Sequence, residues 1–199
     1  MENTKFRLLE DDKIDEWGRI LYRIEALKDF GTVSKGEKGG YVQKSENISV
    51  YSNAWVEGNA RVGGNAWVGG NARVEGNARV VRNAWVEGNA WVEGDACFGG
   101  NAWVGGDARV GGDAWVGGDA RVGGNADFLV IHPIGSENGT LTAFKNKNGK
   151  ISVTRGCFQG SLEEFEQAVD KRHGSSDYAK IYKIAVDLIK SKLVTEGVL

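Results

Sequence analysis

The sequence contains few of the residues on which several classes of protein depend. Only two of its 199 residues are cysteine, Cys97 and Cys157, and their spacing is not that of metal ligands but fits a reducing compartment. The formal net charge of -2 excludes nucleic-acid binding by bulk electrostatics. No apolar run approaches the length of a membrane span, and the first residues do not have the basic-then-apolar pattern of a signal peptide. We therefore expect a cytoplasmic protein that does not enter a membrane.

The sequence has only one proline, whereas thirty residues are glycine, and the glycines recur at a fixed interval. Thirteen consecutive six-residue repeats occupy residues 47–124, and each begins with Asn or Asp. The second residue is alanine in every repeat after Ile48, and the fourth is valine except at Phe98. The sixth is glycine except at Ser52 and Arg82. A period as regular as this predicts a solenoid.

The positions within each repeat predict how the solenoid is built. Alanine and valine stand two residues apart, so in a strand both point inward, where a small and a branched side chain fill a narrow interior. Glycine followed by Asn or Asp is typical of a corner, because glycine adopts a positive φ without steric cost and the Asn or Asp side chain bonds nearby backbone. Three strands and three corners close a triangular coil of eighteen residues, which gives a little over four coils. Arg82 at a corner costs about 1 kcal/mol, and is either a tolerated irregularity or a functional contact.

These repeats resemble the left-handed β-helix of the hexapeptide-repeat family. The family signature is an aliphatic residue, a small or acidic residue, two variable positions and a small residue, which residues 56–60 match as Val-Glu-Gly-Asn-Ala. The resemblance implies a left-handed parallel β-helix, and such helices commonly associate as trimers about parallel axes. The predicted fold class is mainly β: a left-handed parallel β-helix with an N-terminal β cap and a small C-terminal α+β domain.

Three segments follow from these patterns. Residues 1–46 are predicted to cap the open end of the solenoid with short strands, residues 47–127 to form the coils, and residues 128–199 to form a domain of three strands and two helices. In the third segment, Asn148-Gly149 predicts a hairpin, and residues 161–164 predict a capping box at a helix start. The last helix is predicted to have a single apolar stripe: Ile181, Ile184, Ala185, Leu188 and Ile189.

Outward positions that recur every eighteen residues predict columns down the faces of the solenoid. One face carries Trp55, Arg73, Trp91 and Arg109. Rings and guanidinium groups stack there, and a neighbouring row of glutamates neutralises the charge, so a structural role suffices. Another face carries Trp67, Trp85 and Trp103, which together would expose on the order of 500 Å² of apolar surface. We expect a cover for these three, either the C-terminal segment or, as the resemblance favours, another subunit of a homo-oligomer, with a trimer favoured.

Histidine is also scarce, and its positions bear on catalysis. Many hexapeptide-repeat proteins are acyltransferases, which use a histidine base at the subunit interface and bind acyl-CoA along the helix. His132 and His173 lie outside the repeats, and no loop is inserted between the coils. His132 fits a strand end, and His173 fits a helix end. We therefore predict no catalytic residue and no cofactor, and an acyltransferase stays as an alternative.

Two other solenoid functions are excluded by what the repeats lack. They contain no threonine, whereas ice binding needs flat rows of threonine. Calcium-binding repeats have a period of nine, and here the period is six. Asp95 and Asp113 share a column but supply too few oxygens for a hard cation, so we predict no metal site.

Two sets of residues are candidates for ligand binding. The turn over residues 156–160 comes just before a predicted helix, so its backbone N–H groups suit an anion or a phosphate. The alternative is a simple strand-to-helix turn with a buried cysteine. On the coils, tryptophan and arginine share the outer surface, where a ring can stack on a base and a guanidinium can hold a phosphate. The predicted ligand-binding residues are Trp115, Arg121, Arg155, Gly156 and Cys157.

Segments outside the repeats extend the resemblance. The stretches "LYRIEALKDFG", "KGGYV", "ENIS", "FLVIHPIGSENG" and "GCFQGSLEEFEQAV" together resemble a group of bacteriophage and prophage proteins over nearly the whole chain. One departure is Glu37-Lys38, where the group has an acidic-aliphatic pair. The resemblance implies a phage origin and an accessory role. Our leading hypothesis is a non-enzymatic protein that captures a host component, either a nucleotide-like defence signal or a host protein, and the alternative is a structural oligomer without a ligand.

Overall fold

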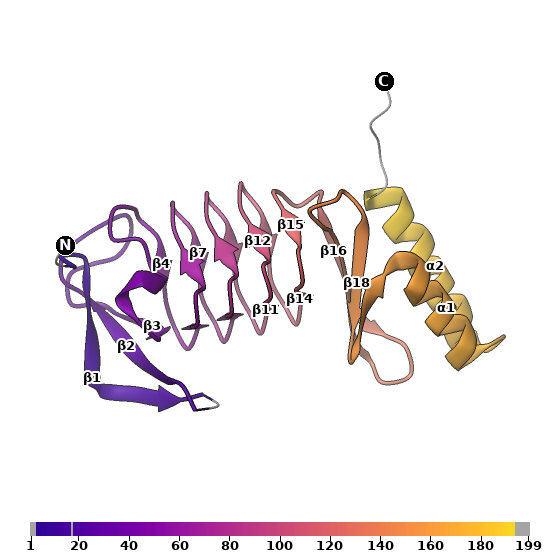
Figure 1. The fold of residues 1–199 in the computed structure, drawn as a ribbon, viewed down its shortest axis with the longest axis horizontal. Helices are drawn as coiled ribbons and strands as arrows, with labels where there is room; N and C mark the ends of the chain where they lie inside the picture. Colours follow the sequence, from indigo (N-terminus) through magenta and orange to yellow (C-terminus); the bar gives the residue numbers. More distant parts are fainter. Residues whose placement is uncertain (1–2, 17, 194–199) are drawn as a thin grey trace, which may run out of the picture.

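The computed structural model describes residues 3–16 and 18–193. Residues 1–2, 17 and 194–199, which include the outer ends of the predicted cap and of the predicted C-terminal domain, lie outside the described residues. The molecule is elongated (Figure 1): an N-terminal hairpin, a row of stacked coils, and an antiparallel sheet covered by two helices follow one another along its length.

The coils form a parallel β-solenoid, as the period predicts. The coil strands β4 to β15 are each two residues long, and each strand from β4 to β12 pairs in parallel with the strand eighteen residues later. The tryptophan face consists of β6 (Trp67–Val68), β9 (Trp85–Val86), β12 (Trp103–Val104) and β15 (Arg121–Val122). The glutamate face consists of β4 (Trp55–Val56), β7 (Arg73–Val74), β10 (Trp91–Val92) and β13 (Arg109–Val110). The hairpin face consists of β3 (Lys38–Val42), β5 (Arg61–Val62), β8 (Arg79–Val80), β11 (Cys97–Phe98) and β14 (Trp115–Val116). Because β3 joins the stack, the solenoid has about five turns rather than a little over four.

The first predicted repeat is two residues out of register. Tyr41 pairs with Arg61, and Ile48 pairs with Val68, so both steps span twenty residues instead of eighteen. Asn47 is the last residue of the 3-10 helix η1 (Ser45–Asn47) and is buried. Its side-chain amide donates to the carbonyls of Ala66 (2.7 Å) and Gly64 (3.2 Å). The regular period begins at the next repeat, residues 53–58, which is the first with alanine in the second position, valine in the fourth and glycine in the sixth.

The corners have the conformation that the glycines predict. Glycines in the sixth position of the repeats up to Gly118 have φ between +56° and +71°, and Arg82 adopts the same conformation with φ of +64°, whereas Gly124 at the end of the last repeat does not have a positive φ. The Asn side chains, in contrast, bond one another rather than nearby backbone. Seven of these amides donate to the Asn or Asp one coil further on, at 2.9 to 3.3 Å, along Asn53, Asn71, Asn89 and Asp107, along Asn65, Asn83, Asn101 and Asp119, and from Asn77 to Asp95. Aspartate accepts but does not donate, which is why it ends each ladder.

The N-terminal hairpin covers the first coils. Strands β1 (Phe6–Asp15) and β2 (Ile20–Ala26) pair antiparallel, and β2 pairs with β3. The sequence places Trp55 on the outer surface of the coil, but the cap buries it completely. Phe6 and Phe30 meet its indole edge-on, with ring centroids 6.3 and 5.4 Å away.

Lys5 is buried beneath this cap. Its ammonium donates to the carbonyls of Ser49 (2.9 Å) and Ala54 (2.5 Å), which belong to the first coil and have no preceding coil strand to bond. The ammonium also lies 4.5 Å from the centre of the Phe30 ring. Burial, together with the charge of Lys28, lowers the pKa of Lys5 from 10.5 to about 8.

This pKa predicts how stability depends on pH. Between pH 8 and 10.5 the unfolded chain still binds the Lys5 proton, whereas the folded chain has released it. The free energy of unfolding should therefore rise with pH across this interval, by up to about 3 kcal/mol from Lys5 alone. Urea unfolding of the wild type and of Lys5→Met at several pH values measures the contribution as the difference between their slopes. Parallel slopes for the two proteins would contradict it.

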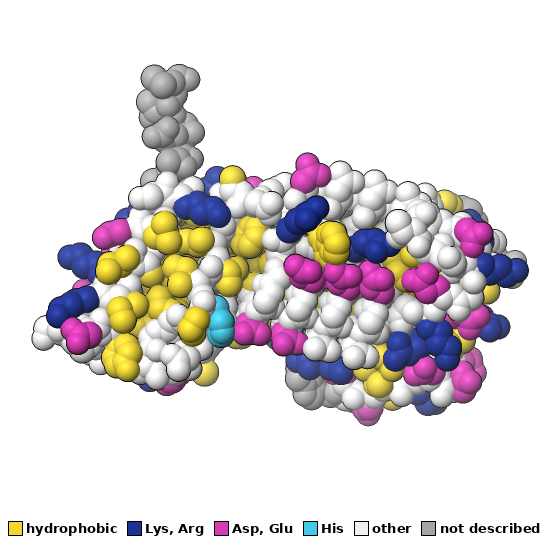
Figure 2. Space-filling model, turned by 180° about the vertical axis from the view of Figure 1, so that it is seen from behind, with side chains coloured by type: hydrophobic (Ala, Val, Ile, Leu, Met, Phe, Trp, Pro, Cys, Tyr) yellow, Lys and Arg dark blue, Asp and Glu magenta, His cyan; other side chains and the backbone are white. Residues whose placement is uncertain are grey.

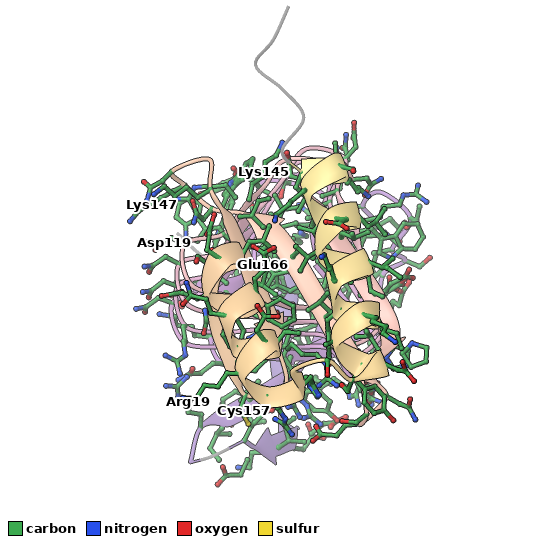
Figure 3. All side chains as sticks on the ribbon, turned by 90° about the vertical axis from the view of Figure 1, so that its right-hand side faces the viewer. Arg19, Asp119, Lys145, Lys147, Cys157 and Glu166 are labelled. Carbon is green, nitrogen blue, oxygen red and sulfur yellow. The ribbon has the colours of Figure 1, made fainter. Side chains whose placement is uncertain are left out.

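The C-terminal sheet closes the other end of the solenoid. Four antiparallel strands, one more than predicted, are ordered β16 (Phe128–Ile134), β17 (Gly139–Lys145), β18 (Ile151–Arg155) and β19 (Phe158–Ser161). The Trp115 backbone has no further coil strand to pair with, so its N–H donates to the Thr142 hydroxyl (3.1 Å) and its carbonyl accepts from the Thr154 hydroxyl (2.7 Å). Lys147 also points toward Asp119 at the end of a ladder (Figure 3), and the two form an ion pair of 2.7 Å.

Two helices cover the outer face of this sheet, α1 (Leu162–His173) and α2 (Asp177–Leu193). The predicted capping box is confirmed, because the Ser161 hydroxyl accepts from the Glu164 N–H at 3.1 Å and the Glu164 carboxylate accepts from the Ser161 N–H at 2.7 Å. The predicted apolar stripe of the last helix is wrong in part. α2 buries Tyr182, Ala185, Val186, Ile189 and Leu193, and it exposes Ile181, Ile184 and Leu188. In the described part of the chain, neither helix is long and apolar enough to span a membrane.

Candidate ligand-binding site

The glutamate face makes its own contacts, as the structural interpretation expects. Arg73 pairs with Glu57 at 3.2 Å, the Trp91 indole N–H donates to Glu75, and the Arg109 guanidinium lies 5.2 Å from the centre of the Trp91 indole. Burial, and then the neighbouring carboxyl of Glu75, raise the pKa of Glu57. The row of acidic side chains beside these residues is visible in Figure 2. The Arg73, Trp91 and Arg109 side chains are therefore engaged within this face, whereas Trp55 is covered by the N-terminal cap.

On the tryptophan face, the three indoles differ in exposure because their neighbours differ. Trp67 lies over Gly69, and Trp103 lies over Gly105, where a side chain would collide with the ring. Trp85 has Glu87 in the equivalent position, and this carboxylate accepts from the Trp103 indole N–H at 2.7 Å. Trp67 and Trp103 are thus half-buried and Trp85 remains 48% exposed, so the face exposes less apolar surface than three upright rings would.

Trp115 and Arg121, which the sequence offers as a ring and a cation on one surface, lie on different faces. Trp115 belongs to the hairpin face, whereas Arg121 belongs to the tryptophan face next to Trp103. The Arg121 guanidinium donates to the carbonyls of Asn101 (3.1 Å) and Ala120 (3.0 Å). The structure does not bring this pair together as a clamp for one ligand.

The turn at Gly156 and Cys157 is a hairpin turn and not the entry to a helix. Because Phe158–Ser161 is a strand, it carries the chain away from the turn before helix α1 begins. The N-terminus of α1, capped by Ser161, therefore lies at the opposite end of the sheet from this turn. The prediction that these N–H groups adjoin a helix N-terminus is therefore wrong. Cys157 is exposed, which also contradicts the alternative of a buried cysteine.

Arg155, Gly156 and Cys157 nevertheless line one cavity, of about 350 Å³. Helix α1 runs back along the sheet after β19, so its C-terminal end stands beside the hairpin turn, where Figure 3 shows Cys157. The remaining wall comes from the turn between β16 and β17 and from α2. The lining residues that sequence reasoning missed include Glu137, Phe158, Phe165, Arg172 and Tyr182.

Aromatic rings form the floor of this cavity. Phe165 packs against Phe158 and Tyr182, with ring centroids 5.3 and 5.6 Å apart, and Tyr182 packs against His173 at 5.5 Å. The Tyr182 hydroxyl reaches the backbone of Gly135 so closely that any side chain there would collide with it. In the sequence, Gly135 could therefore have indicated that another group approaches the backbone closely, but not that this group is Tyr182.

Two arginines supply the positive charge. Arg155 crosses above Gly139 and donates to the carbonyl of Ile134 at 3.0 Å. Its Nε is buried and has no hydrogen-bond partner among the described residues. Arg172 pairs with Glu137 at 3.1 Å, and both side chains are mostly exposed. The cavity therefore combines a cluster of tilted and edge-on rings with two guanidinium groups: Arg155 has a buried donor without a partner among the described residues, and Arg172 forms a surface ion pair.

The two histidines lie outside the coils. His132, in β16, shares a hydrogen bond of 2.9 Å with the Thr140 hydroxyl, and its ring lies 3.8 Å from the Asp113 carboxylate. His173 ends α1 and lines the cavity, a position that the prediction of a helix-end role does not include. Within residues 3–16 and 18–193, no group of three or more His, Cys, Asp or Glu side chains is placed to hold a metal ion.

Comparison with known proteins adds no relative to these observations. No protein-family model matches the chain, and no curated protein matches it.

Proposed function

We propose that this protein binds, without chemical conversion, a small anionic molecule with a flat ring, of the nucleotide type, in the cavity beside Arg155. The observation that carries the proposal is the buried Nε of Arg155, which has no partner among the described residues although it borders a cavity. A buried donor without an acceptor destabilises a protein by about 1–3 kcal/mol, so a ligand oxygen that accepts from it gains that energy on binding.

The dimensions and chemistry of the cavity support this class of ligand. Its volume of about 350 Å³ lies within the range typical of small-molecule sites and fits one mononucleotide unit. Guanidinium groups hold phosphate by charge-assisted, often bidentate hydrogen bonds, which Arg155 and Arg172 can supply from two sides. The Phe158 ring, which is partly exposed, can stack on a base. Glu137 disfavours an anion unless Arg172 stays paired with it, so Arg155 is expected to contribute most.

The resemblance to phage and prophage proteins supports a role for such binding in the interaction between a phage and its host. We propose that the protein sequesters a nucleotide-type defence signal of the host cell, and that it acts as a stoichiometric binder. Neither histidine belongs to a repeat, although His132 lies 3.8 Å from Asp113 of the coils, and this favours binding over the acyltransferase alternative, which by the resemblance uses a base at the subunit interface of the helix.

A second candidate function is assembly, and the exposed Trp85 ring favours it. Trp85 stacks on Trp67 at 5.2 Å and borders a shallow cavity of about 310 Å³ with Lys44 and Glu46. A trimer built on this face, as the family resemblance implies, would cover it. In that case Trp85→Ala would dissociate the oligomer, and no ligand would be found at Arg155.

Isothermal titration with nucleoside monophosphates, diphosphates and cyclic dinucleotides tests the binding site. We expect at least one of these probes to bind the wild type, and Arg155→Glu to weaken its Kd by at least about 100-fold, because charge reversal replaces an attraction with a repulsion. Arg121→Glu is the matched control, since Arg121 is an exposed arginine that does not line the cavity. Equal Kd values for wild type and Arg155→Glu, or a loss confined to Arg121→Glu, would refute the site.

A further inference from the structure

Helix α2 has two apolar stripes but only one of them packs against the sheet. The second stripe, which does not pack against the sheet among the described residues, consists of Tyr178, Ile181, Ile184 and Leu188, whose exposed fractions are 43%, 45%, 69% and 50%, and only Tyr178 of these has a ring contact, with His173 at 6.0 Å. Ile181, Ile184 and Leu188 are spaced by three and then four residues, the spacing of a seam along which another helix packs. A soluble monomer seldom exposes three branched aliphatic side chains in a row, so this face calls for a cover.

The stripe lies beside the free edge of the C-terminal sheet. In the order β16-β17-β18-β19, strand β16 pairs only with β17 among residues 3–16 and 18–193, and α2 packs over β16 and β17 while α1 packs over β18 and β19. The Leu129, Val130 and Ile131 side chains of β16 are half-buried. Figure 2 shows hydrophobic side chains gathered on one face of the C-terminal sheet and helices. An edge strand carries unpaired backbone groups, which are ready to bond another strand.

We propose that a second copy of this chain covers this face, about a two-fold axis that passes close to Ile184. The axis sets the two α2 helices antiparallel, stripe against stripe, and brings the two β16 edges together in antiparallel orientation. Such an interface is isologous, so the face must be complementary to itself.

The charges on α2 meet this condition. Lys180 lies four residues before Ile184, and Asp187 lies three residues after it. In an antiparallel pair centred on Ile184, each Lys180 therefore faces the Asp187 of the other copy, which gives two ion pairs across the axis. In the single chain, the Lys180 ammonium pairs with Asp177 at 2.8 Å, and both side chains are mostly exposed, so this ion pair can be exchanged at little cost.

The available area is also adequate. The four residues of the stripe expose roughly 400 Å², about half of what each partner buries in a standard stable interface, and the β16 edge supplies further surface. This interface shares no residue with the tryptophan face and none with the cavity beside Arg155. It is therefore independent of the proposed ligand and of a trimer built on Trp85.

Sedimentation velocity on the purified full chain tests the proposal. We expect the wild type to be a dimer, or a larger assembly with an even number of copies, at micromolar concentration, and Ile184→Glu to weaken self-association by at least about 100-fold, because it buries two carboxylates on the axis. Ile184 is exposed, so the variant should keep the circular dichroism and melting temperature of the wild type. Trp85→Ala and Ile20→Glu, at exposed apolar positions elsewhere, are the controls and should still dimerise.

A disulfide experiment locates the axis itself. In a chain whose two native cysteines are replaced by serine, Ile184→Cys should form a disulfide-linked dimer on mild oxidation, because the two copies of residue 184 meet at the axis. Lys183→Cys should not, since one residue along the helix turns this side chain by about 100° away from Ile184, toward α1. A monomeric wild type, a trimer, or an oligomer that persists in Ile184→Glu and dissociates in Trp85→Ala would overturn the proposal.

Discussion

Replacing Trp55 with alanine is expected to lower the free energy of unfolding by about 4 kcal/mol, whereas the same replacement at Trp85 should lower it by less than about 1 kcal/mol. Both tryptophans occupy the third position of an identical repeat, Asn-Ala-Trp-Val-Glu-Gly. Trp55 is fully buried under the N-terminal cap against Phe6 and Phe30, while Trp85 is about half exposed. The difference between the two variants therefore measures the packing of the cap, with local sequence held constant.

Urea unfolding followed by circular dichroism gives both values. The Trp55 indole N–H is buried and lacks a hydrogen-bond partner among the described residues, so removing the indole also removes the cost of burying this unpaired donor. The expected loss of unfolding free energy therefore stays within the usual range for a buried aromatic residue. Equal losses at Trp55 and Trp85 would show that the cap does not cover the first coils as described.

Replacing Gly88 with alanine is expected to cost about 3 kcal/mol or more. Gly88 has φ of +68°, which costs an alanine about 1–2 kcal/mol, and the added Cβ would lie 2.7 Å from the backbone nitrogen of Gly106 in the next coil. The corners are held at this spacing by the hydrogen bond from Asn89 N–H to the Gly106 carbonyl, 2.8 Å long, so the backbone cannot yield without opening the stack.

Gly112→Ala is the matched control, because Gly112 has φ of +63° but no atom of the described residues lies within 4 Å of an added Cβ. It should cost only the conformational strain, about 1–2 kcal/mol. The melting temperatures of the two variants separate strain from collision. If Gly112→Ala destabilises as much as Gly88→Ala, close contact between stacked corners is not what restricts this position to glycine.

The repeats could be predicted from the sequence because each position has one local physical reason. Alternation fixed which side chains point inward, and a sixth-position glycine required a positive φ, so that even Arg82 could be assigned to the left-handed region. Pairing at eighteen residues followed from these two facts. The Asn ladders could not be predicted in the same way, because an Asn side chain at a corner can bond either local backbone or the next coil, and only stacking decides between them.

Features that depend on distant segments could not be predicted. Trp55 and Trp85 occupy identical six-residue repeats, and distant segments distinguish them: the cap buries Trp55, whereas Trp85 packs against Trp67 of the preceding coil. Helix α2 has apolar residues on two sides, so its hydrophobic period does not reveal which side packs on the sheet. For the candidate site, the turn in the sequence pointed to Arg155, Gly156 and Cys157. The strand after this turn was not recognised, and without it the sequence could not show that α1 runs back along the sheet and brings Arg172 and His173 to the same cavity.

Native mass spectrometry tests the central proposal, that the cavity beside Arg155 captures a nucleotide-type anion. The protein would be purified from bacteria with and without an active nucleotide-signalling defence, together with Arg155→Glu. We expect an extra mass per subunit from the cells with the defence, a mass in the nucleotide range that is lost on denaturation and absent from Arg155→Glu. The mass of the polypeptide alone under both conditions, or an extra mass that Arg155→Glu retains, would contradict the account.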